Sequence, residues 1–215
     1  MASLRANDSA RRPLGGVLTK PFLFISTLVL ASVLLGACSE PTLGGMVRTP
    51  EPYVGDVSLP DASDGERDFL TIAEENEILV VYFGYTQCPD ICPTTMSDLR
   101  KAVEDLGRDG DRVDVAFITV DPERDTPEHI TGYVQSFFDD GHALRTEDVA
   151  RLEKAVLSYG AAFSITTDAD GTVEVGHSAL LYAVDSTGHI LVQWPFGTLP
   201  EDMTNDLKIL LRKET

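Results

Sequence analysis

Two cysteines, Cys88 and Cys92, are separated by three residues within the stretch 82–96. The apolar run 78–83 before them predicts a buried strand, and the apolar residues after them recur at helical spacing. The cysteines are therefore expected where a strand ends and a helix begins. The free N–H groups and partial positive charge of a helix N-terminus favour a thiolate over a thiol. Because a thiolate attacks disulfides and binds soft metals, this stretch predicts redox or metal chemistry.

Residues 1–37 have the pattern of an export signal. Basic residues precede an apolar run at 22–35, which is short for a membrane span and typical of a signal-peptide core. Small residues stand directly before Cys38, as in the bacterial lipobox, so we expect lipid on Cys38 and a domain held at the extracytoplasmic face of the cell membrane. An uncleaved N-terminal anchor helix is the alternative. Residues 38–52, in which Ser, Gly, Pro and Thr are frequent, are expected to form a flexible tether.

The three cysteines of the chain divide into one for lipid and one close pair. Outside the cytoplasm, Cys88 and Cys92 could form a structural disulfide. A bridge that closes so small a loop constrains the unfolded chain little and would therefore stabilise the fold little. This favours redox or metal chemistry over a structural role for the pair.

Length and charge limit the function further. The chain has 215 residues, enough for one globular domain, expected at 53–215, after the leader and tether. Its formal net charge of −18 argues against nucleic acid as a partner, because phosphates would be repelled. A cationic partner, a metal ion or solubility alone is compatible with this charge.

Strands and helices alternate along the rest of the chain. The expected strands are 54–59, 68–72, 78–83, 113–120, 162–166, 177–184 and 189–194. The expected helices are 92–107, one capped by Thr126 with Pro127 at its first position, one over 149–159, and one opened by the capping-box pattern Thr198-x-x-Glu201. This order predicts an α/β domain with a mixed sheet flanked by helices. Thiols at the first strand–helix junction of such a unit suggest a single thioredoxin-like domain.

The chain has four histidines, His129, His142, His177 and His189, and spacing alone does not single out one of them as a functional residue. His129 is expected in the first turn of a helix and His142 in a Gly-flanked loop, both solvated. His189 follows a turn and is expected at the edge of a strand.

Other polar and aromatic residues near these motifs have simpler interpretations. Asp121 and Asp125 are expected to shape a strand-to-helix turn rather than to bind metal. Tyr85 and Trp194 are expected to pack in the core or on the surface, although either could flank the site. Pro93 suits the first position of the helix that follows the cysteines.

Three blocks of this sequence resemble the signature of the Sco/SenC family. They are FGYTQCPDICP at 83–93, VDPERDTP at 120–127, and His177-Ser178 followed by YAVD at 182–185 and then Gly188. Their order and spacing agree with the family over roughly residues 53–213. Gly176 is a departure, since many members have Asp before the histidine. It concerns the surroundings of His177 and removes no expected ligand.

The resemblance implies a thioredoxin-like fold, membrane anchoring and copper binding, with Cys88, Cys92 and His177 as the ligands. It also implies a role in delivering copper to the CuA centre of cytochrome c oxidase, or in keeping the cysteines of that centre reduced. The expected partner is the CuA-bearing oxidase subunit, with other copper chaperones or thiol reductants as further candidates.

The chemistry of these ligands agrees with copper. Thiolates select Cu(I), and imidazole suits both Cu(I) and Cu(II). Zinc also takes Cys and His, but a structural zinc site usually has four protein ligands.

Three functions remain to be compared. The first is a copper-binding assembly factor rather than a turnover enzyme. The second is a thiol–disulfide oxidoreductase, in which one cysteine attacks a partner disulfide, the other resolves the mixed disulfide, and Cys88 and Cys92 are bridged in the oxidised form. The spacer of three residues differs from the two-residue spacer of thioredoxins, and His177 discriminates, since only copper binding needs it. The third is a lipoprotein with an inert disulfide that acts as an interaction module.

Overall fold

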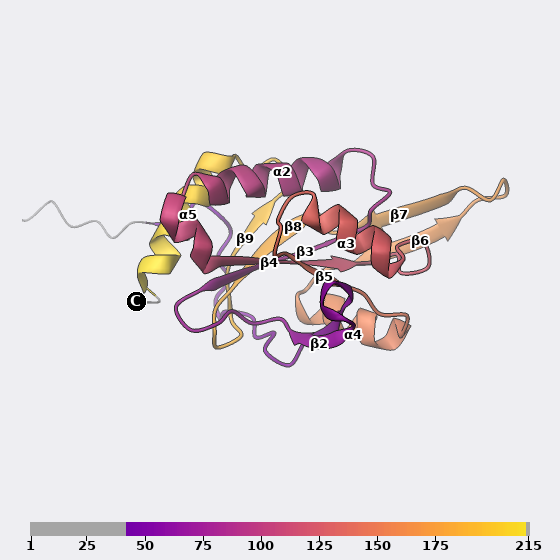
Figure 1. Cartoon of the computed structure of the whole chain (residues 1–215), viewed down its shortest axis with the longest axis horizontal. Coiled ribbons are helices and arrows are strands. Elements are labelled where there is room, and N and C mark those ends of the chain that lie inside the picture. Colours follow the sequence, from indigo (N-terminus) through magenta and orange to yellow (C-terminus); the bar gives the residue numbers. More distant parts are fainter. Residues whose placement is uncertain (1–41, 214–215) are drawn as a thin grey trace, which may run out of the picture. The chain divides into compact units, whose positions relative to one another are not determined.

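A mixed sheet of seven strands forms the centre of the computed structural model, which describes residues 42–213 (Figure 1). The strand order is β2-β1-β5-β4-β3-β8-β9, and β6 and β7 form a separate two-stranded hairpin. The strands are β1 Ser58–Asp61, β2 Arg67–Leu70, β3 Ile78–Gly84, β4 Val113–Thr119, β5 His142–Leu144, β6 Phe163–Thr167, β7 Val173–His177, β8 Leu180–Val184 and β9 Ile190–Pro195. Strands β3, β4 and β5 run parallel, whereas β1, β2, β8 and β9 join antiparallel.

Helices cover both faces of the sheet. They are α2 Ile91–Glu104, α3 Pro127–Gln135, α4 Val149–Ser158 and α5 Pro200–Lys213, with short 3-10 turns η1 Ala62–Asp64 and η2 Gly107–Arg112. Helices α2, α3 and α5 pack on one face, and α4 packs on the other. None of the helices within residues 42–213 is long and apolar enough to cross a membrane. The expected mixed sheet flanked by helices, in a single thioredoxin-like domain, is confirmed.

The central strand β3 shows why the sequence pattern identified this core. Every residue of β3 is buried, because helices cover both faces of the sheet and β4 and β8 flank the strand on its two edges. Alternate side chains enter opposite layers: Ile78, Val80 and Tyr82 pack against α2, α3 and α5, whereas Leu79, Val81 and Phe83 pack on the α4 side. The loop 85–90, which carries Cys88 and is called the cysteine loop below, leaves the carboxyl end of this strand.

The first described residues are fixed to the domain by a buried carboxylate. Asp206 on α5 accepts hydrogen bonds from Gly44 N (2.7 Å), Gly45 N (2.9 Å) and Trp194 Nε1 (2.8 Å). A Cβ on Gly45 would lie 2.5 Å from Val192, so only glycine allows this approach. Residues 44–46, which we expected to belong to the flexible tether, therefore lie against α5 and β9.

His142 differs from its prediction as a solvated loop residue. It begins β5, stacks on Phe69 with ring centroids 3.8 Å apart, and directs Nδ1 to Asp61 Oδ2 (2.6 Å) and Nε2 to Asp114 Oδ2 (3.0 Å). Burial opposes a charge here, but the hydrogen bonds to Asp114 and Asp61 outweigh it and raise the pKa of His142 to about 9. The prediction was wrong because the carboxylate partners lie 81 and 28 residues away in the sequence.

The predicted strand 177–184 corresponds to β8, which begins only at Leu180. His177 is instead the last residue of β7, a strand that was not predicted. β7 returns on β6 in the hairpin, where Phe163 is paired with His177, through a turn in which Gly171 has a φ of 86°. This turn was missed, and so was the three-residue strand β5. Neither β7 nor β5 has an apolar run long enough to be recognised as a strand in the sequence.

Three helix ends were also predicted incorrectly. Thr198 does not form the capping box: its hydroxyl donates to the Pro195 carbonyl, and α5 begins at Pro200. Pro93 is the third residue of α2 rather than the first; its missing N–H is tolerated because the first turn has no intrahelical acceptors. α2 ends at Glu104, before η2.

Replacing Asp206 by Ala should lower the free energy of unfolding by about 2 kcal/mol, because the buried Trp194 N–H would lose its acceptor and residues 44–46 their anchor. Urea unfolding of the purified protein measures this. Asn205→Ala, an exposed neighbour on α5, is the matched control and should change stability by less than about 0.5 kcal/mol. Equal stability of the Asp206→Ala and wild-type proteins would contradict the anchoring role.

The free energy of unfolding should also fall as the pH rises from 6.5 to 9. The pKa of His142 is about 9 in the folded protein, against 6.5 for an ordinary histidine, so the native state keeps a proton that the unfolded chain has lost. One such proton contributes a slope of at most about 1.4 kcal/mol per pH unit. His142→Gln should remove this part of the slope, and His129→Gln, at an exposed position, should keep it. The same slope in all three proteins would refute the assignment.

Candidate metal centre

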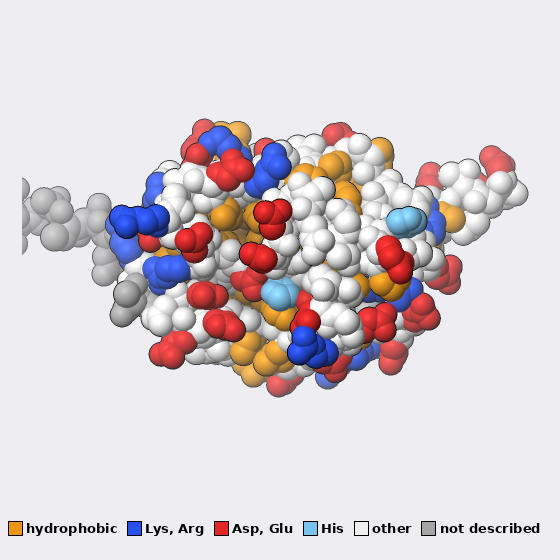
Figure 2. All heavy atoms as spheres, viewed as in Figure 1, with side chains coloured by type: hydrophobic (Ala, Val, Ile, Leu, Met, Phe, Trp, Pro, Cys, Tyr) orange, Lys and Arg blue, Asp and Glu red, His pale blue; other side chains and the backbone are white. Residues whose placement is uncertain are grey.

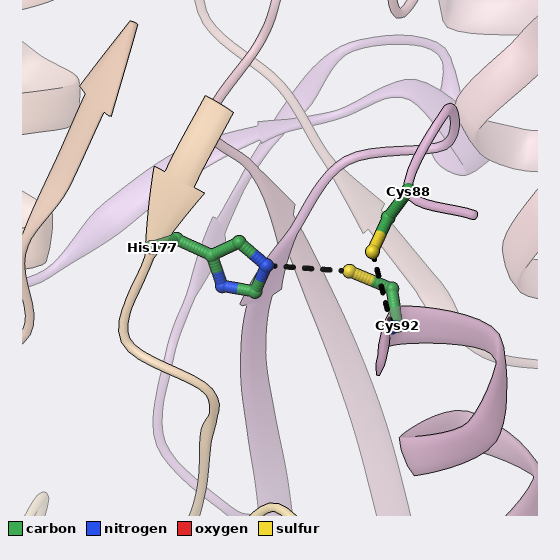
Figure 3. Close-up of side chains that lie close together, drawn as sticks. All are labelled: Cys88, Cys92 and His177. Carbon is green, nitrogen blue, oxygen red and sulfur yellow. Dashed lines mark hydrogen bonds between the residues drawn. The ribbon is translucent and has the colours of Figure 1, made fainter. Parts of the chain in front are cut away.

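Cys88, Cys92 and His177 converge at one end of the sheet. Cys88 lies in the loop after β3, Cys92 is the second residue of α2, and His177 is the last residue of β7 (Figure 3). Their ligand atoms all lie within 4.8 Å of one another. No other group of three or more His, Cys, Asp or Glu residues within 42–213 is arranged to hold a metal ion. The structure thus brings together the three residues that the resemblance implied.

The sulfur of Cys88 occupies the N-terminus of α2. The N-cap residue Asp90 makes no side-chain capping bond, and Cys92 N–H instead donates to Cys88 Sγ at 3.3 Å. Cys88 N–H in turn donates to the Tyr85 carbonyl at 3.3 Å, which folds the loop back on itself. Both cysteine sulfurs therefore lie at the positive end of a helix, as expected from the sequence.

A buried carboxylate fixes the start of the cysteine loop. Asp125 is fully buried and accepts hydrogen bonds from Thr86 N (3.0 Å), Thr86 Oγ1 (2.6 Å) and Thr119 Oγ1 (2.5 Å). Asp121 nearby pairs with Arg124. The prediction that Asp121 and Asp125 shape the turn is confirmed, but the link from Asp125 to the cysteine loop was missed. The sequence does contain a signal for this link. The loop with Cys88 follows β3 and the loop with Asp125 follows β4, and the carboxyl ends of these parallel neighbouring strands meet.

Cys92 is the deeper of the two cysteines. It is fully buried in the core, whereas Cys88 is half-buried, and both are free thiols. A Cβ on Gly84 would lie 3.0 Å from Cys92 Sγ, so the glycine leaves the space that this sulfur fills. Burial raises the pKa of Cys92 to about 12. The expectation that the helix N-terminus makes it a thiolate is wrong for the metal-free protein, because the cost of burying the charge is larger.

His177 is held in the tautomer that suits a ligand. Its Nδ1 lies 3.2 Å from the Ser178 carbonyl, which can only accept, so Nδ1 carries the proton. Nε2 is then free to accept and lies 3.4 Å from Cys92 Sγ. Burial lowers the pKa of His177, so the imidazole is neutral at pH 7. Gly176, where we expected an Asp in many relatives, lies opposite Ser164 in the hairpin.

Two tyrosines flank the imidazole. The rings of Tyr82 and Tyr85 each meet His177 edge-on, with centroids 5.9 Å apart. Tyr82 also donates its hydroxyl to Cys92 Sγ at 3.7 Å, a contact that was not predicted, since this residue lies in the apolar run 78–83 that predicts a buried strand. Trp194 is buried against Asp206, as expected for a core residue.

The remaining candidate residues lie outside this site. His129 is exposed in the first turn of α3, as predicted. His189 lies just before β9, beside Tyr53 and Thr187. Cys38 falls outside residues 42–213, so its lipidation stays a prediction.

Comparison with known proteins places this fold and site in a family. A model of the SCO1/SenC family matches residues 56–212. The SCO2-like protein of Rickettsia conorii is 29% identical over 201 residues, which are 86% of this chain and 96% of the relative. The corresponding protein of Rickettsia typhi is 33% identical over 178 residues, which are 75% of this chain and 85% of the relative.

Solved structures agree with this match. The structure of Bradyrhizobium japonicum ScoI with copper bound is 30% identical, with a TM-score of 0.61, and the match covers 78% of this chain and 98% of that one. Arabidopsis thaliana ScoI with copper bound supports the fold, with a TM-score of 0.64 at 24% identity over 74% of this chain and 99% of that one. With the family model covering most of residues 42–213, the chain belongs to the SCO1/SenC family.

Proposed function

We propose that this protein is a membrane-anchored copper-binding protein that delivers copper to the CuA centre of cytochrome c oxidase, or keeps the cysteines of that centre reduced, during assembly of the oxidase. The observation that carries the proposal is the convergence of Cys88, Cys92 and His177, whose ligand atoms lie within 4.8 Å of one another. The family is linked to cytochrome c oxidase assembly, which makes the CuA-bearing subunit the proposed partner.

The donor set suits copper. Cys88 Sγ, Cys92 Sγ and His177 Nε2 would hold the ion, because thiolates select Cu(I) and a neutral imidazole binds either oxidation state. A structural zinc site usually takes four protein ligands, and no fourth His, Cys, Asp or Glu joins this group within the described residues. A site with three ligands also leaves a position for a ligand of the recipient, which transfer requires. The Bradyrhizobium japonicum relative has copper bound in its structure.

The position of the domain follows from its proposed anchor. Lipid on Cys38 would hold it at the extracytoplasmic face of the cell membrane. Because Gly44 and Gly45 are fixed on Asp206, residues 39–43 would form the connection.

The surface charge supports a protein or metal partner rather than nucleic acid. The net charge is −18, and Asp and Glu side chains are spread over the face seen in Figure 2 without forming one patch. Phosphate backbones would be repelled by this surface. The charge is therefore compatible with solubility and with a metal ion or a cationic partner.

The second candidate is an extracytoplasmic thiol–disulfide oxidoreductase. Cys88 and Cys92 are free thiols whose sulfurs lie within 4.8 Å of each other, so they could form a disulfide in the oxidised state and be restored by a thiol reductant. The two functions are compatible, because only the reduced pair can hold copper. They differ in their need for His177.

Anaerobic Cu(I) titration of the reduced protein should give one tight equivalent. Cys88→Ser, Cys92→Ser and His177→Ala should each weaken binding by at least about 100-fold, since losing a ligand costs more than the 10–100-fold typical of losing its outer partner. His129→Ala, an exposed histidine on α3, is the control and should bind as the wild type does. If the wild-type protein binds no copper specifically but its Cys88–Cys92 pair cycles reversibly, the oxidoreductase is the better assignment.

The Cu(I) affinity should rise with pH. The pKa of Cys92 is about 12, so between pH 6 and 8 binding must displace at least one proton from the protein. The affinity is expected to increase about tenfold per pH unit for each proton displaced. Competition with a chelator of known pH dependence measures this slope. A pH-independent affinity would show that Cys92 does not bind as a thiolate.

A further inference from the structure

The phenol of Tyr82 lies directly behind the proposed site. Tyr82 belongs to β3 and is fully buried, and its hydroxyl donates to Cys92 Sγ at 3.7 Å. Its ring also meets the His177 imidazole edge-on, at 5.9 Å between centroids and 78° between planes. One side chain thus contacts two of the three proposed ligands.

The hydroxyl of Thr95 does not compete with that of Tyr82 for the sulfur of Cys92. Thr95 lies one turn along α2 and directs its own proton to the Ile91 carbonyl at 2.8 Å. The thiol of Cys92 faces His177 Nε2 at 3.4 Å on its other side. The Tyr82 hydroxyl is therefore the side-chain O–H donor to Cys92 Sγ, within the part of the chain that the structure describes.

A metal ion would change what this sulfur needs. Binding would replace the thiol proton and leave a thiolate at a fully buried position. A buried negative charge is costly unless it is compensated by a metal or by hydrogen bonds. Donation to an ionised acceptor is stronger than donation to a neutral one, so the contact from Tyr82 gains strength when the metal is present.

We propose that Tyr82 is a positioning residue of the copper centre, whose hydroxyl donates a hydrogen bond to the Cys92 thiolate and thereby stabilises Cu(I) relative to Cu(II). This inference rests on the copper-binding function proposed above. Hydrogen bonds to a ligating sulfur tune the reduction potential of copper–thiolate and iron–sulfur sites. The site is more negative with Cu(I) than with Cu(II), so a donor at the sulfur favours the reduced form.

Tyr82→Phe tests the proposal because it removes the hydroxyl and keeps the ring in the core. In the Cu(II)-loaded protein, the sulfur-to-copper charge-transfer band should move to longer wavelength, since the thiolate becomes a stronger electron donor. The Cu(II)/Cu(I) midpoint potential should fall, and the Cu(I) affinity should fall by about tenfold. Absorption spectroscopy, redox titration and chelator competition measure the three changes.

Tyr182→Phe is the matched control. Tyr182 lies on the neighbouring strand β8 opposite Val81, and its buried hydroxyl has no hydrogen-bond partner among the described residues. Its ring packs on the far side of the sheet against Phe83 and Tyr159, away from the cysteines. The band, the potential and the affinity should all stay as in the wild type.

A ring-fluorinated tyrosine at position 82 provides a test that does not depend on removing a buried group. Fluorination makes the phenol a stronger hydrogen-bond donor while keeping its shape. The band should then move to shorter wavelength and the potential should rise, opposite to the changes in Tyr82→Phe. This opposite sign would not follow from altered packing.

Each outcome decides the proposal. A copper-loaded Tyr82→Phe protein with an unchanged band and potential would overturn it while leaving the copper-binding function intact. Equal shifts in Tyr82→Phe and Tyr182→Phe would reduce the effect to general packing. A shift in Tyr133→Phe alone would assign the donor to Tyr133, whose buried hydroxyl has no partner within residues 42–213. Failure of the wild-type protein to bind copper would instead refute the proposed function.

Discussion

The geometry of the site depends on the fully buried carboxylate of Asp125. Its two oxygens receive the backbone and hydroxyl of Thr86 and the hydroxyl of Thr119, so it joins the carboxyl ends of β3 and β4. The loop that carries Cys88 has no strand or helix of its own, and this network is what fixes where it starts. Buried polar networks whose members are all satisfied are rigid and specify one arrangement, because an unpaired member is costly in a low dielectric. The two cysteines are thereby held close together before any metal arrives.

The sulfurs of Cys88 and Cys92 differ in how deeply they are buried. Cys92 is enclosed by Gly84, Tyr82 and His177, and burial keeps it protonated until a metal displaces the proton. Cys88 is half-buried in a loop whose neighbours are exposed. Cys92 is thus the fully buried member of the group, whereas Cys88 and His177 are both half-buried.

Buried carboxylates recur as joints between distant segments elsewhere in the domain. Asp206 ties the first described residues to α5 and β9, and Asp61 joins β1 to β5 through His142 and the Ala143 N–H. Each is fully partnered, which offsets the cost of burying its charge. These joints lie away from the cysteines, so the scaffold can be perturbed separately from the site. Some acidic residues of the chain therefore stabilise the fold from inside the domain, whereas others are solvated.

The sequence alone determined the fold class, the central strand and the cysteine loop, because these rest on local patterns: a continuous apolar run, helical spacing, and three motif blocks in order. It did not determine His177, which only the family resemblance chose, or the ion pairs of His142. His177 contacts Cys92, which lies 85 positions away in the sequence, and His142 contacts Asp61, which lies 81 positions away. Periodicity does not encode contacts between such distant residues. The missed β6–β7 hairpin is decisive, because its register brings His177 to the cysteines. The protonation of Cys92 was likewise decided by burial, which only tertiary packing creates.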